Sequence, residues 1–315
     1  MGGASSSPAP RKQHVLVVGG TGRTGRRLVE RLVADGRFEV SVVVRDHEKA
    51  QLVFGDLELN DVFEGDLCDV ASWADRLEGI DQVVTAVSCG ECTDPMAVLG
   101  FRPMPANVPS ATDAEGIRAL AAAAKAHGVR RFVAVTSAST GSPWSPAAIF
   151  LNAYHYGSIK AKWAGEQAIR ESGIPYTIIR PYGLGPDAPP AVPDAAPAAA
   201  AARGMEWSQA ETVSSERRRI PRDDVARLCH EALLLEPGKE GAPPERATLE
   251  CWSTAAHAKG MEWDKLTPDP PGKLPHRDHD TPVAVALGGV ALGSAAVLRG
   301  SWRAARGLLR LASRA

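Results

Sequence analysis

Short apolar runs alternate with longer amphipathic stretches over the first 250 residues of the chain. Continuous β-branched runs indicate strands buried on both faces, and apolar positions three or four residues apart indicate helices. Strands are expected at 15–18, 39–44, 61–67, 81–87, 131–136, 176–181 and 246–252. Helices are expected at 26–33, 70–77, 112–127, 156–171 and from 221 onward. This alternation predicts an α/β fold of the Rossmann type, a doubly wound parallel sheet with right-handed crossovers.

Signals at the helix ends refine this prediction. Thr112 and Glu115 have the spacing of a capping box, so Thr112 is expected to begin one helix and Gly128 to follow its last turn. Pro221 stands at the entry of the last helix, where the fixed φ of proline suits a first turn. Proline and alanine dominate residues 185–204, which we expect to form a flap over a substrate.

Three glycines at three-residue spacing follow the first predicted strand and precede a predicted helix. This context is typical of a dinucleotide site. Gly19 permits the tight turn, Gly22 lets the backbone approach a pyrophosphate, and Gly25 lets the helix pack close to the strand. The helix N-terminus offers N–H groups and the positive end of the helix dipole to the phosphates. The predicted cofactor-binding loop comprises Gly19, Thr21, Gly22, Arg23, Thr24 and Gly25.

The end of the second predicted strand bears on the choice of cofactor. NAD sites usually place a carboxylate there to bind the ribose 2′-hydroxyl. This chain has Arg45, whose planar guanidinium suits a 2′-phosphate, and Arg23 in the glycine loop could reach the same group. The sequence therefore favours NADP(H), although Asp46 could serve the ribose if Arg45 turned outward.

Composition is that of an ordinary globular protein. The 315 residues are 44% hydrophobic and 23% charged, and the net charge of −1 gives no indication of nucleic-acid binding. Five scattered cysteines do not form a disulfide scaffold, so we expect a reducing intracellular compartment, either the cytosol or an organelle matrix or stroma. Residues 1–12 lack the apolar core of a secretory signal and are expected to be flexible.

Several motifs together resemble the atypical short-chain dehydrogenase/reductases, particularly the NAD(P)H-binding, NmrA-like family. The resemblance runs from about residue 13 to residue 253. The motifs are Gly19-Gly20-Thr21-Gly22-Arg23-Thr24-Gly25, Val44-Arg45-Asp46, Gly65-Asp66-Leu67, Arg131-Phe132-Val133 with Thr136-Ser137, Tyr176-Thr177-Ile178-Ile179-Arg180-Pro181, and Ile220-Pro221-Arg222-Asp223-Asp224-Val225-Ala226.

The resemblance implies further contacts with the cofactor. Asp66 and Leu67 would border the adenine, Ala86 and Val87 would line the cofactor beyond it, and the chain from Pro181 onward would approach the nicotinamide. The family includes reductases of quinones, flavins and pigments. It also includes members that bind NADP(H) mainly to regulate or assemble other proteins, and many atypical members lack the usual catalytic tyrosine.

A candidate catalytic group lies at the start of the helix predicted at 156–171. Tyr156 and Lys160 are four residues apart, which would place the phenol and the ammonium on one helix face. A neighbouring Lys⁺ favours the phenolate and can lower the pKa of a tyrosine. By resemblance Ser137 would hold the substrate oxygen, with Ser139 as a second candidate, and Lys160 could also bind the nicotinamide ribose. Tyr154 could be the inward-pointing tyrosine instead.

Two cysteines, Cys89 and Cys92, follow the fourth predicted strand on the edge of the sheet where ligands bind. A C-x-x-C pair there could be redox active, and it could equally be two unconnected reduced thiols. The sequence around it has no second close Cys or His pair, so we predict no metal site.

The C-terminal part of the chain has a different composition. Residues 255–280 are polar and contain prolines, which is typical of a linker. Residues 281–298 carry no charge, a length at the lower limit for a membrane span, and Gly289 and Gly293 form a G-x-x-x-G pair. Five arginines follow, at positions 299, 303, 306, 310 and 314. This apolar helical tail, 281–315, could contact a membrane or dock on a partner protein.

Two functions remain open from the sequence. The first is an NADP(H)-dependent oxidoreductase that transfers hydride to a small or hydrophobic carbonyl, quinone or enone, with Tyr156 donating a proton. The second is an NADP(H)-binding accessory, assembly or regulatory subunit of a membrane-associated complex. The pair of Tyr156 and Lys160 favours the enzyme, and the tail favours the subunit.

Overall fold

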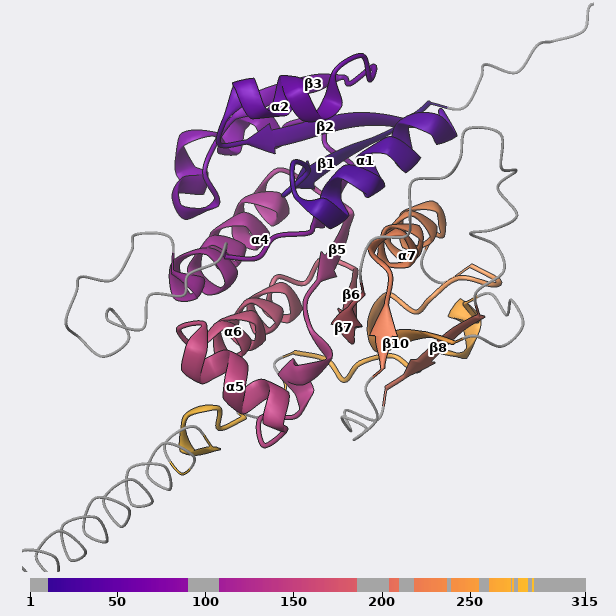
Figure 1. Cartoon of the computed structure of the whole chain (residues 1–315). Coiled ribbons are helices and arrows are strands. Elements are labelled where there is room, and N and C mark those ends of the chain that lie inside the picture. Colours follow the sequence, from indigo (N-terminus) through magenta and orange to yellow (C-terminus); the bar gives the residue numbers. More distant parts are fainter. Residues whose placement is uncertain are drawn as a thin grey trace, which may run out of the picture.

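The computed structural model describes residues 11–89, 108–185, 204–209, 218–236, 239–254, 261–272, 274, 277–282 and 285. An eight-stranded sheet forms the centre of this part of the chain (Figure 1). In order across the sheet, the strands are β3 (Asp61–Glu64), β2 (Phe38–Val44), β1 (Gln13–Val18), β4 (Gln82–Thr85), β5 (Arg131–Val135), β6 (Tyr176–Pro181), β10 (Arg246–Thr254) and β8 (Gly204–Ser208).

Every neighbouring pair in the sheet is parallel except β10 and β8, which are antiparallel. The first strand, β1, lies between β2 and β4, so the strand order reverses there. This reversal leaves a crevice at the carboxyl ends of the strands, where ligands bind in open α/β sheets. The predicted Rossmann-type fold is confirmed.

Helices cover both faces of the sheet. On one face lie α1 (Arg23–Asp35) and α7 (Arg222–Leu234), and on the other lie α4 (Ile117–Ala126) and α6 (Ser158–Glu171) (Figure 1). Another helix, α5 (Pro146–Tyr154), packs beside α6, and α2 (His47–Phe54) follows β2. A separate two-stranded ribbon joins β7 (Gly183–Leu184) and β9 (Arg219–Ile220).

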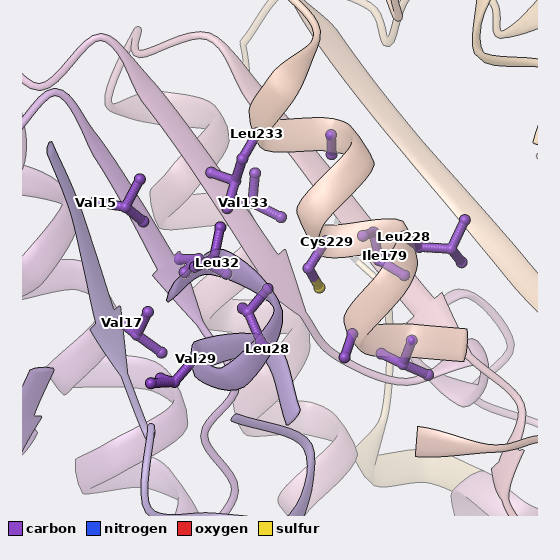
Figure 2. Close-up of a cluster of buried hydrophobic side chains, with 14 of the residues drawn as sticks. Val15, Val17, Leu28, Val29, Leu32, Val133, Ile179, Leu228, Cys229 and Leu233 are labelled. Atoms are coloured by element: carbon purple, nitrogen blue, oxygen red, sulfur yellow. The ribbon is translucent and has the colours of Figure 1, made fainter. Parts of the chain in front are cut away.

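Alternating side chains of β1 divide the core into two layers. Val15 and Val17 join the hydrophobic cluster under α1 and α7, whereas Leu16 and Val18 join the cluster under α4. Each side chain is almost completely buried, which explains the uninterrupted apolar run in the sequence. Figure 2 shows how the two helices of the first layer meet over the sheet, through Leu28 and Leu32 of α1 and Leu228, Cys229 and Leu233 of α7.

The prediction of a helix at 70–77 is wrong. Two short 3₁₀ segments stand there, η1 (Leu67–Ser72) and η2 (Ala74–Leu77). Asp66 starts the first segment early by accepting the N–H of Cys68 at 2.8 Å. Trp73 then interrupts the helix with φ −135°, and its indole N–H donates to the carbonyl of Asp66 at 2.9 Å. Burying the indole ring fixes this backbone, which helical periodicity does not predict.

The predicted start at Thr112 is also wrong. The helical segment begins as a π-helix, η3 (Ser110–Gly116), which continues directly into α4. The hydroxyl of Thr112 donates to the carbonyl of Val108 at 3.3 Å, so it does not cap an N-terminus. The predicted end is confirmed, because Gly128 has φ +76° and its N–H donates to the carbonyl of Lys125.

Part of the predicted linker packs on the domain. We name the described residues 261–272, 274 and 277–282 the C-terminal strap. Trp263 and Leu266 of the strap are buried in the core beside α7, and the indole N–H of Trp263 donates to Glu231 at 3.0 Å. The predictions for the flexible N-terminus, the flap and the tail concern residues that lie mostly outside the described ranges.

Candidate cofactor site at the carboxyl ends of the strands

The glycine loop joins β1 to α1 in a conformation that depends on its glycines. Gly19 has φ +89°, and a Cβ there would lie 2.8 Å from the carbonyl oxygen of Ala86 and 2.9 Å from the side chain of Val87. A Cβ on Gly25 would overlap the carbonyl oxygen of Gly19. The N–H of Gly22 closes the turn by donating to that same oxygen at 3.0 Å. The loop therefore lies against Ala86 and Val87, which follow β4; their contact with the cofactor stays a prediction.

The first turn of α1 is suited to an anion. Gly22 is the N-cap residue and has no side chain with which to cap the N–H groups of the first turn. Within α1, which is described throughout, that turn carries no acidic residue. Backbone N–H groups and the positive end of the dipole therefore face the crevice, which fits a diphosphate. Arg23 and Thr24 are the first two residues of this helix.

Asp46 caps the helix that follows β2. Its carboxylate caps α2 by accepting the N–H of Lys49 at 2.9 Å. A cap of this kind is worth about 1 kcal/mol. Arg45 stands one residue earlier, at the carboxyl end of β2, with an exposed side chain. The arginine is thus positioned at the end of this strand while the carboxylate beside it serves the helix.

Asp66 and Leu67 follow the neighbouring strand, β3, at the same edge of the sheet. Asp66 is the N-cap of η1, and Leu67 is buried beneath it. Both residues therefore stand just beyond the carboxyl end of β3, and their contact with the adenine stays a prediction.

The pair of Tyr156 and Lys160 is not arranged as the sequence suggested. The helix expected at 156–171 begins two residues later, as α6, after a break at 155–157 where Tyr156 has φ +49° and Gly157 has φ +74°. Tyr156 therefore lies outside the helix that carries Lys160, and the two do not share a helix face. The ammonium of Lys160 binds the carboxylate of Asp280 in the C-terminal strap at 2.6 Å. The catalytic role of both residues stays a prediction.

A different lysine faces the crevice. Lys162 binds the carboxylate of Asp113 at 2.6 Å and donates to the carbonyl of Val87 at 3.3 Å, and its side chain is only 10% exposed. Together with Thr136 at the end of β5, these residues line a small pocket between β4, β5 and α6. We did not predict Lys162 from the sequence. Its spacing of four residues from Glu166 places both on the buried face of α6, and this was the available signal.

The remaining candidates lie near the ends of β5 and β6. The hydroxyl of Ser137 accepts the N–H of Ser139 and begins a 3₁₀ turn, η4 (Ala138–Gly141). Pro181 ends β6. The side chain of Tyr154 is 57% exposed and stacks on Phe150, so the alternative that it points inward is wrong.

A buried network of ion pairs lies beside the pocket that Lys162 and Thr136 line. Arg180 of β6 donates to both carboxylate oxygens of Glu166, at 3.1 and 2.6 Å, and Arg170 donates to the same carboxylate at 3.2 Å. The hydroxyl of Thr136 donates to it at 2.7 Å. Burial alone would raise the pKa of Glu166, but the two guanidinium groups outweigh it and hold the pKa at about 2. The carboxylate is therefore charged throughout the physiological range.

Three further predictions concern the C-x-x-C pair, metal ions and membrane spans. The backbone N–H of Cys89 donates to Asp113 at 3.2 Å, while Cys92 lies outside the described residues, so the C-x-x-C prediction stays open. In the described ranges, no cluster of three or more His, Cys, Asp or Glu side chains is positioned for a metal ion. Within the same ranges, no helix has the length and apolar character to cross a bilayer.

Comparison with known proteins agrees with this geometry. Residues 19–236 match the family described as NAD(P)H-binding. The chain belongs to this family. It is 35% identical over 237 residues to an uncharacterized chloroplastic protein of Arabidopsis thaliana, covering 72% of this chain and 74% of that protein. It is 28% identical over 261 residues to sanguinarine reductase of Eschscholzia californica, covering 74% of this chain and 88% of the reductase.

Two further likenesses bear on function and fold. Protein TIC 62, chloroplastic, of Pisum sativum is 32% identical over 185 residues, which are 54% of this chain and 32% of that protein. The solved structure of a putative NAD-dependent epimerase/dehydratase from Bacillus halodurans superimposes with a TM-score of 0.58 at 23% identity, covering 78% of this chain and 96% of the other. The family model describes NAD(P)H binding, and the solved structure shows the Rossmann fold.

Proposed function

We propose that the protein is an NADP(H)-dependent oxidoreductase. The observation that carries the choice of NADP(H) is the division of roles between Arg45 and Asp46. The carboxylate that could bind a ribose 2′-hydroxyl caps α2, and the exposed guanidinium beside it suits a 2′-phosphate. The uncapped first turn of α1 supports diphosphate binding next to it.

When bound, NADPH supplies the hydride. The loop from Gly19 to Gly25 would hold the diphosphate, and Asp66 and Leu67 would border the adenine. The ammonium of Lys162 stands next to Val87 and Asp113, where it could bind the nicotinamide ribose in place of Lys160. Tyr156 remains the proposed proton donor, and Ser137 the proposed ligand of the substrate oxygen.

A small or hydrophobic carbonyl, quinone or enone is the proposed substrate class. The likeness to sanguinarine reductase supports an apolar, unsaturated acceptor. The predicted flap at 185–204 would cover the substrate, since its described ends, Gly185 and Gly204, adjoin the ribbon of β7 and β9 and the edge strand β8.

Replacing Arg45 tests the cofactor. We expect Arg45→Ala to weaken NADPH binding at least tenfold and to leave NADH binding unchanged, since a charged hydrogen bond to the 2′-phosphate contributes about 1.5–3 kcal/mol. Fluorescence titration of the full-length protein with each reduced cofactor measures both affinities. Arg118→Ala, which removes an exposed arginine from α4, is the matched control. Equal affinities of the unaltered protein for NADPH and NADH would refute the assignment.

Tyr156→Phe and Lys162→Met test the chemistry. We expect Tyr156→Phe to abolish NADPH oxidation across a panel of quinones and enones while NADPH still binds. Lys162→Met is expected to raise the KM for NADPH, whereas Lys160→Met is expected to leave it unchanged, since Lys160 pairs with the strap. Unchanged turnover in Tyr156→Phe would remove Tyr156 from the mechanism.

A second candidate is an NADP(H)-binding accessory subunit. The split between α5 and α6 favours it, because the usual pairing of a tyrosine and a lysine on one helix is not formed. The likeness to Protein TIC 62 supports the same alternative. Absence of turnover on the whole panel, combined with tight NADPH binding and copurification of a membrane protein, would favour the subunit.

The proposed location is an organelle stroma, supported by the chloroplastic relatives. Contact of residues 281–315 with a membrane or a membrane protein stays part of this proposal. Fractionation of cells that express the full chain, with and without that segment, tests both points.

A further inference from the structure

The outward face of α5 is apolar. The exposed residues of this helix share one side of it and are Pro146, Ala147, Phe150 and Tyr154. The rings of Phe150 and Tyr154 stack with their centroids 4.7 Å apart, and the two side chains are 53% and 57% exposed. Just before the helix, Trp144 is 60% exposed. We name these five residues the α5 patch.

The inward face of α5 carries a polar residue instead. Asn152 is buried, and its side-chain oxygen accepts the backbone N–H groups of Ile159 and Lys160, both at 3.0 Å. These groups belong to the first turn of α6, whose N-cap residue, Gly157, has no side chain to accept them. A helix on the surface of a globular protein normally turns its polar residues outward, so α5 is inverted. The hydrogen bonds of Asn152 fix the rotation of α5 and hold its aromatic rings toward the solvent.

Exposed apolar side chains concentrate in the α5 patch. Three of the six large apolar side chains that are exposed among the described residues belong to it. The sequence has no Asp, Glu, Lys or Arg from Phe132 to Ile159, so no charged side chain of this stretch interrupts the patch. A contiguous exposed apolar surface typically marks a site of contact with a partner protein or a membrane.

The C-terminal strap ends beside the α5 patch. Asp280 binds the ammonium of Lys160, in the first turn of α6, at 2.6 Å, and α5 packs on α6. Figure 1 shows the yellow end of the strap next to α5. Val285, the last residue that the structure describes, is 58% exposed. The uncharged sequence 281–298 therefore begins next to the patch.

The sequence of the tail fits a negatively charged membrane surface. Its five arginines between 299 and 314 recur every three or four residues, a spacing that would place them on one face of a helix. Trp302, Leu308 and Leu311 stand between them, at positions that would lie on other faces. Arginines on one face and apolar residues on the others are typical of segments that lie among the headgroups of anionic lipids.

We propose that the α5 patch is the part of the folded domain that contacts a lipid bilayer with anionic headgroups. The proposal builds on the membrane contact proposed above for residues 281–315 and does not depend on the oxidoreductase activity. Trp144 and Tyr154 have amphipathic rings, which favour the headgroup level of a membrane, and Phe150 adds an apolar ring. The arginines of the tail would bind lipid phosphates on the same surface, so the domain would be held in one orientation.

Vesicle flotation of the full-length protein tests the patch. We expect binding to vesicles of phosphatidylcholine and phosphatidylglycerol, and weaker binding to phosphatidylcholine alone. The double variant Trp144→Gln with Phe150→Gln is expected to bind the anionic vesicles about tenfold more weakly, because two rings no longer bury apolar surface. Leu52→Gln, at an 87% exposed position of α2, is the matched control and is expected to bind as the unaltered protein does.

The Tm and the NADPH affinity of the variants are expected to be unchanged, which separates the patch from folding and from the cofactor site. No binding of the unaltered protein to anionic vesicles would overturn both the patch and the proposed contact of the tail. Undiminished binding by the double variant would overturn the patch alone. A dimer in solution that the double variant dissociates would assign the patch to a second copy of the chain and would also overturn the proposal.

Vesicles with brominated acyl chains give a second measurement, because bromine quenches the fluorescence of a tryptophan that enters the bilayer. The unaltered protein is expected to be quenched, and Trp144→Phe is expected to be quenched less, although it binds the vesicles equally well. Equal quenching of the two proteins would show that Trp144 stays outside the bilayer and would overturn the proposal.

Discussion

At the scale of single residues, Glu166 connects stability to the site. Its carboxylate is completely buried and holds Arg180 and Arg170, and Thr136 at the rim of the pocket donates to it. A buried carboxylate between two guanidinium groups is costly to remove, because each cation is then left buried without its partner. Glu166 thus fixes the end of β5 and the face of α6 that carries Lys162.

Replacing Glu166 tests this connection. Glu166→Gln is expected to lower the free energy of unfolding by about 3–5 kcal/mol at pH 7, the usual cost of breaking a buried ion pair. Urea denaturation measures the change. Glu115→Gln, in an exposed pair with Arg118, is the control and is expected to change stability by less than about 1 kcal/mol. A loss of that small size in Glu166→Gln would contradict the role of the network.

The same residue predicts a dependence on pH. The pKa of Glu166 is about 2 in the folded protein, below its ordinary value of 4.5, so its contribution to stability is complete above pH 4.5. It is lost as the pH falls from about 4.5 towards 2. The difference in unfolding free energy between the unaltered protein and Glu166→Gln should therefore shrink over this interval. Urea denaturation at a series of pH values checks it, and a difference independent of pH would argue against the low pKa.

At the scale of elements, the contact between β1 and α1 decides whether the crevice forms. Gly25 lies in the first turn of α1 against the carbonyl of Gly19, with no room for a Cβ. The helix can place its N-terminus at the crevice only because this contact is so close. The packing of Leu28 and Leu32 then holds the helix on the sheet.

Gly25→Ala is the test at this scale. The added methyl group is expected to push α1 away from the loop and to abolish NADPH binding, with a loss of stability of about 1–3 kcal/mol from overpacking. Fluorescence titration and urea denaturation measure the two effects. Gly183→Ala is the matched control, because a Cβ there would make ordinary contacts at 3.5 Å or more. Full NADPH binding by Gly25→Ala would show that the loop does not contact the phosphates as proposed.

At the scale of the whole molecule, the C-terminal strap belongs to the domain. Trp263 and Leu266 are buried, and Asp269 accepts hydrogen bonds from Thr248 and Tyr176. The strap also reaches α6, where Asp280 pairs with Lys160. The chain therefore has a folded part that extends well beyond the last strand of the sheet.

Two truncations test this extent. A chain ending at residue 282 keeps the strap and is expected to have an unchanged Tm, whereas a chain ending at 254 is expected to be clearly less stable or insoluble. The second loses the buried Trp263 and Leu266, at about 1.5–3 kcal/mol for each large side chain. Thermal unfolding measures both. An unchanged Tm for the chain ending at 254 would show that the strap contributes nothing.

Local pattern determined most of the fold. Largely apolar runs predicted the strands that lie between two others, because a strand buried on both faces is mostly apolar. The spacing of Gly19, Gly22 and Gly25 predicted the loop, because a close backbone approach excludes any side chain. The position of Arg45 at the carboxyl end of β2 was also predictable, because the end of the apolar run marks the end of the strand.

Tertiary structure decided which lysine faces the crevice. The break at 155–157 leaves Tyr156 outside α6, and within α6 Lys162 donates to Val87 whereas Lys160 pairs with the strap. The sequence does not indicate this break, because the positive φ at Tyr156 costs energy locally and is stable only through contacts made elsewhere. The contacts of the C-terminal strap have the same origin, since Gln209 and Thr267 are far apart in sequence and meet only when the sheet is assembled.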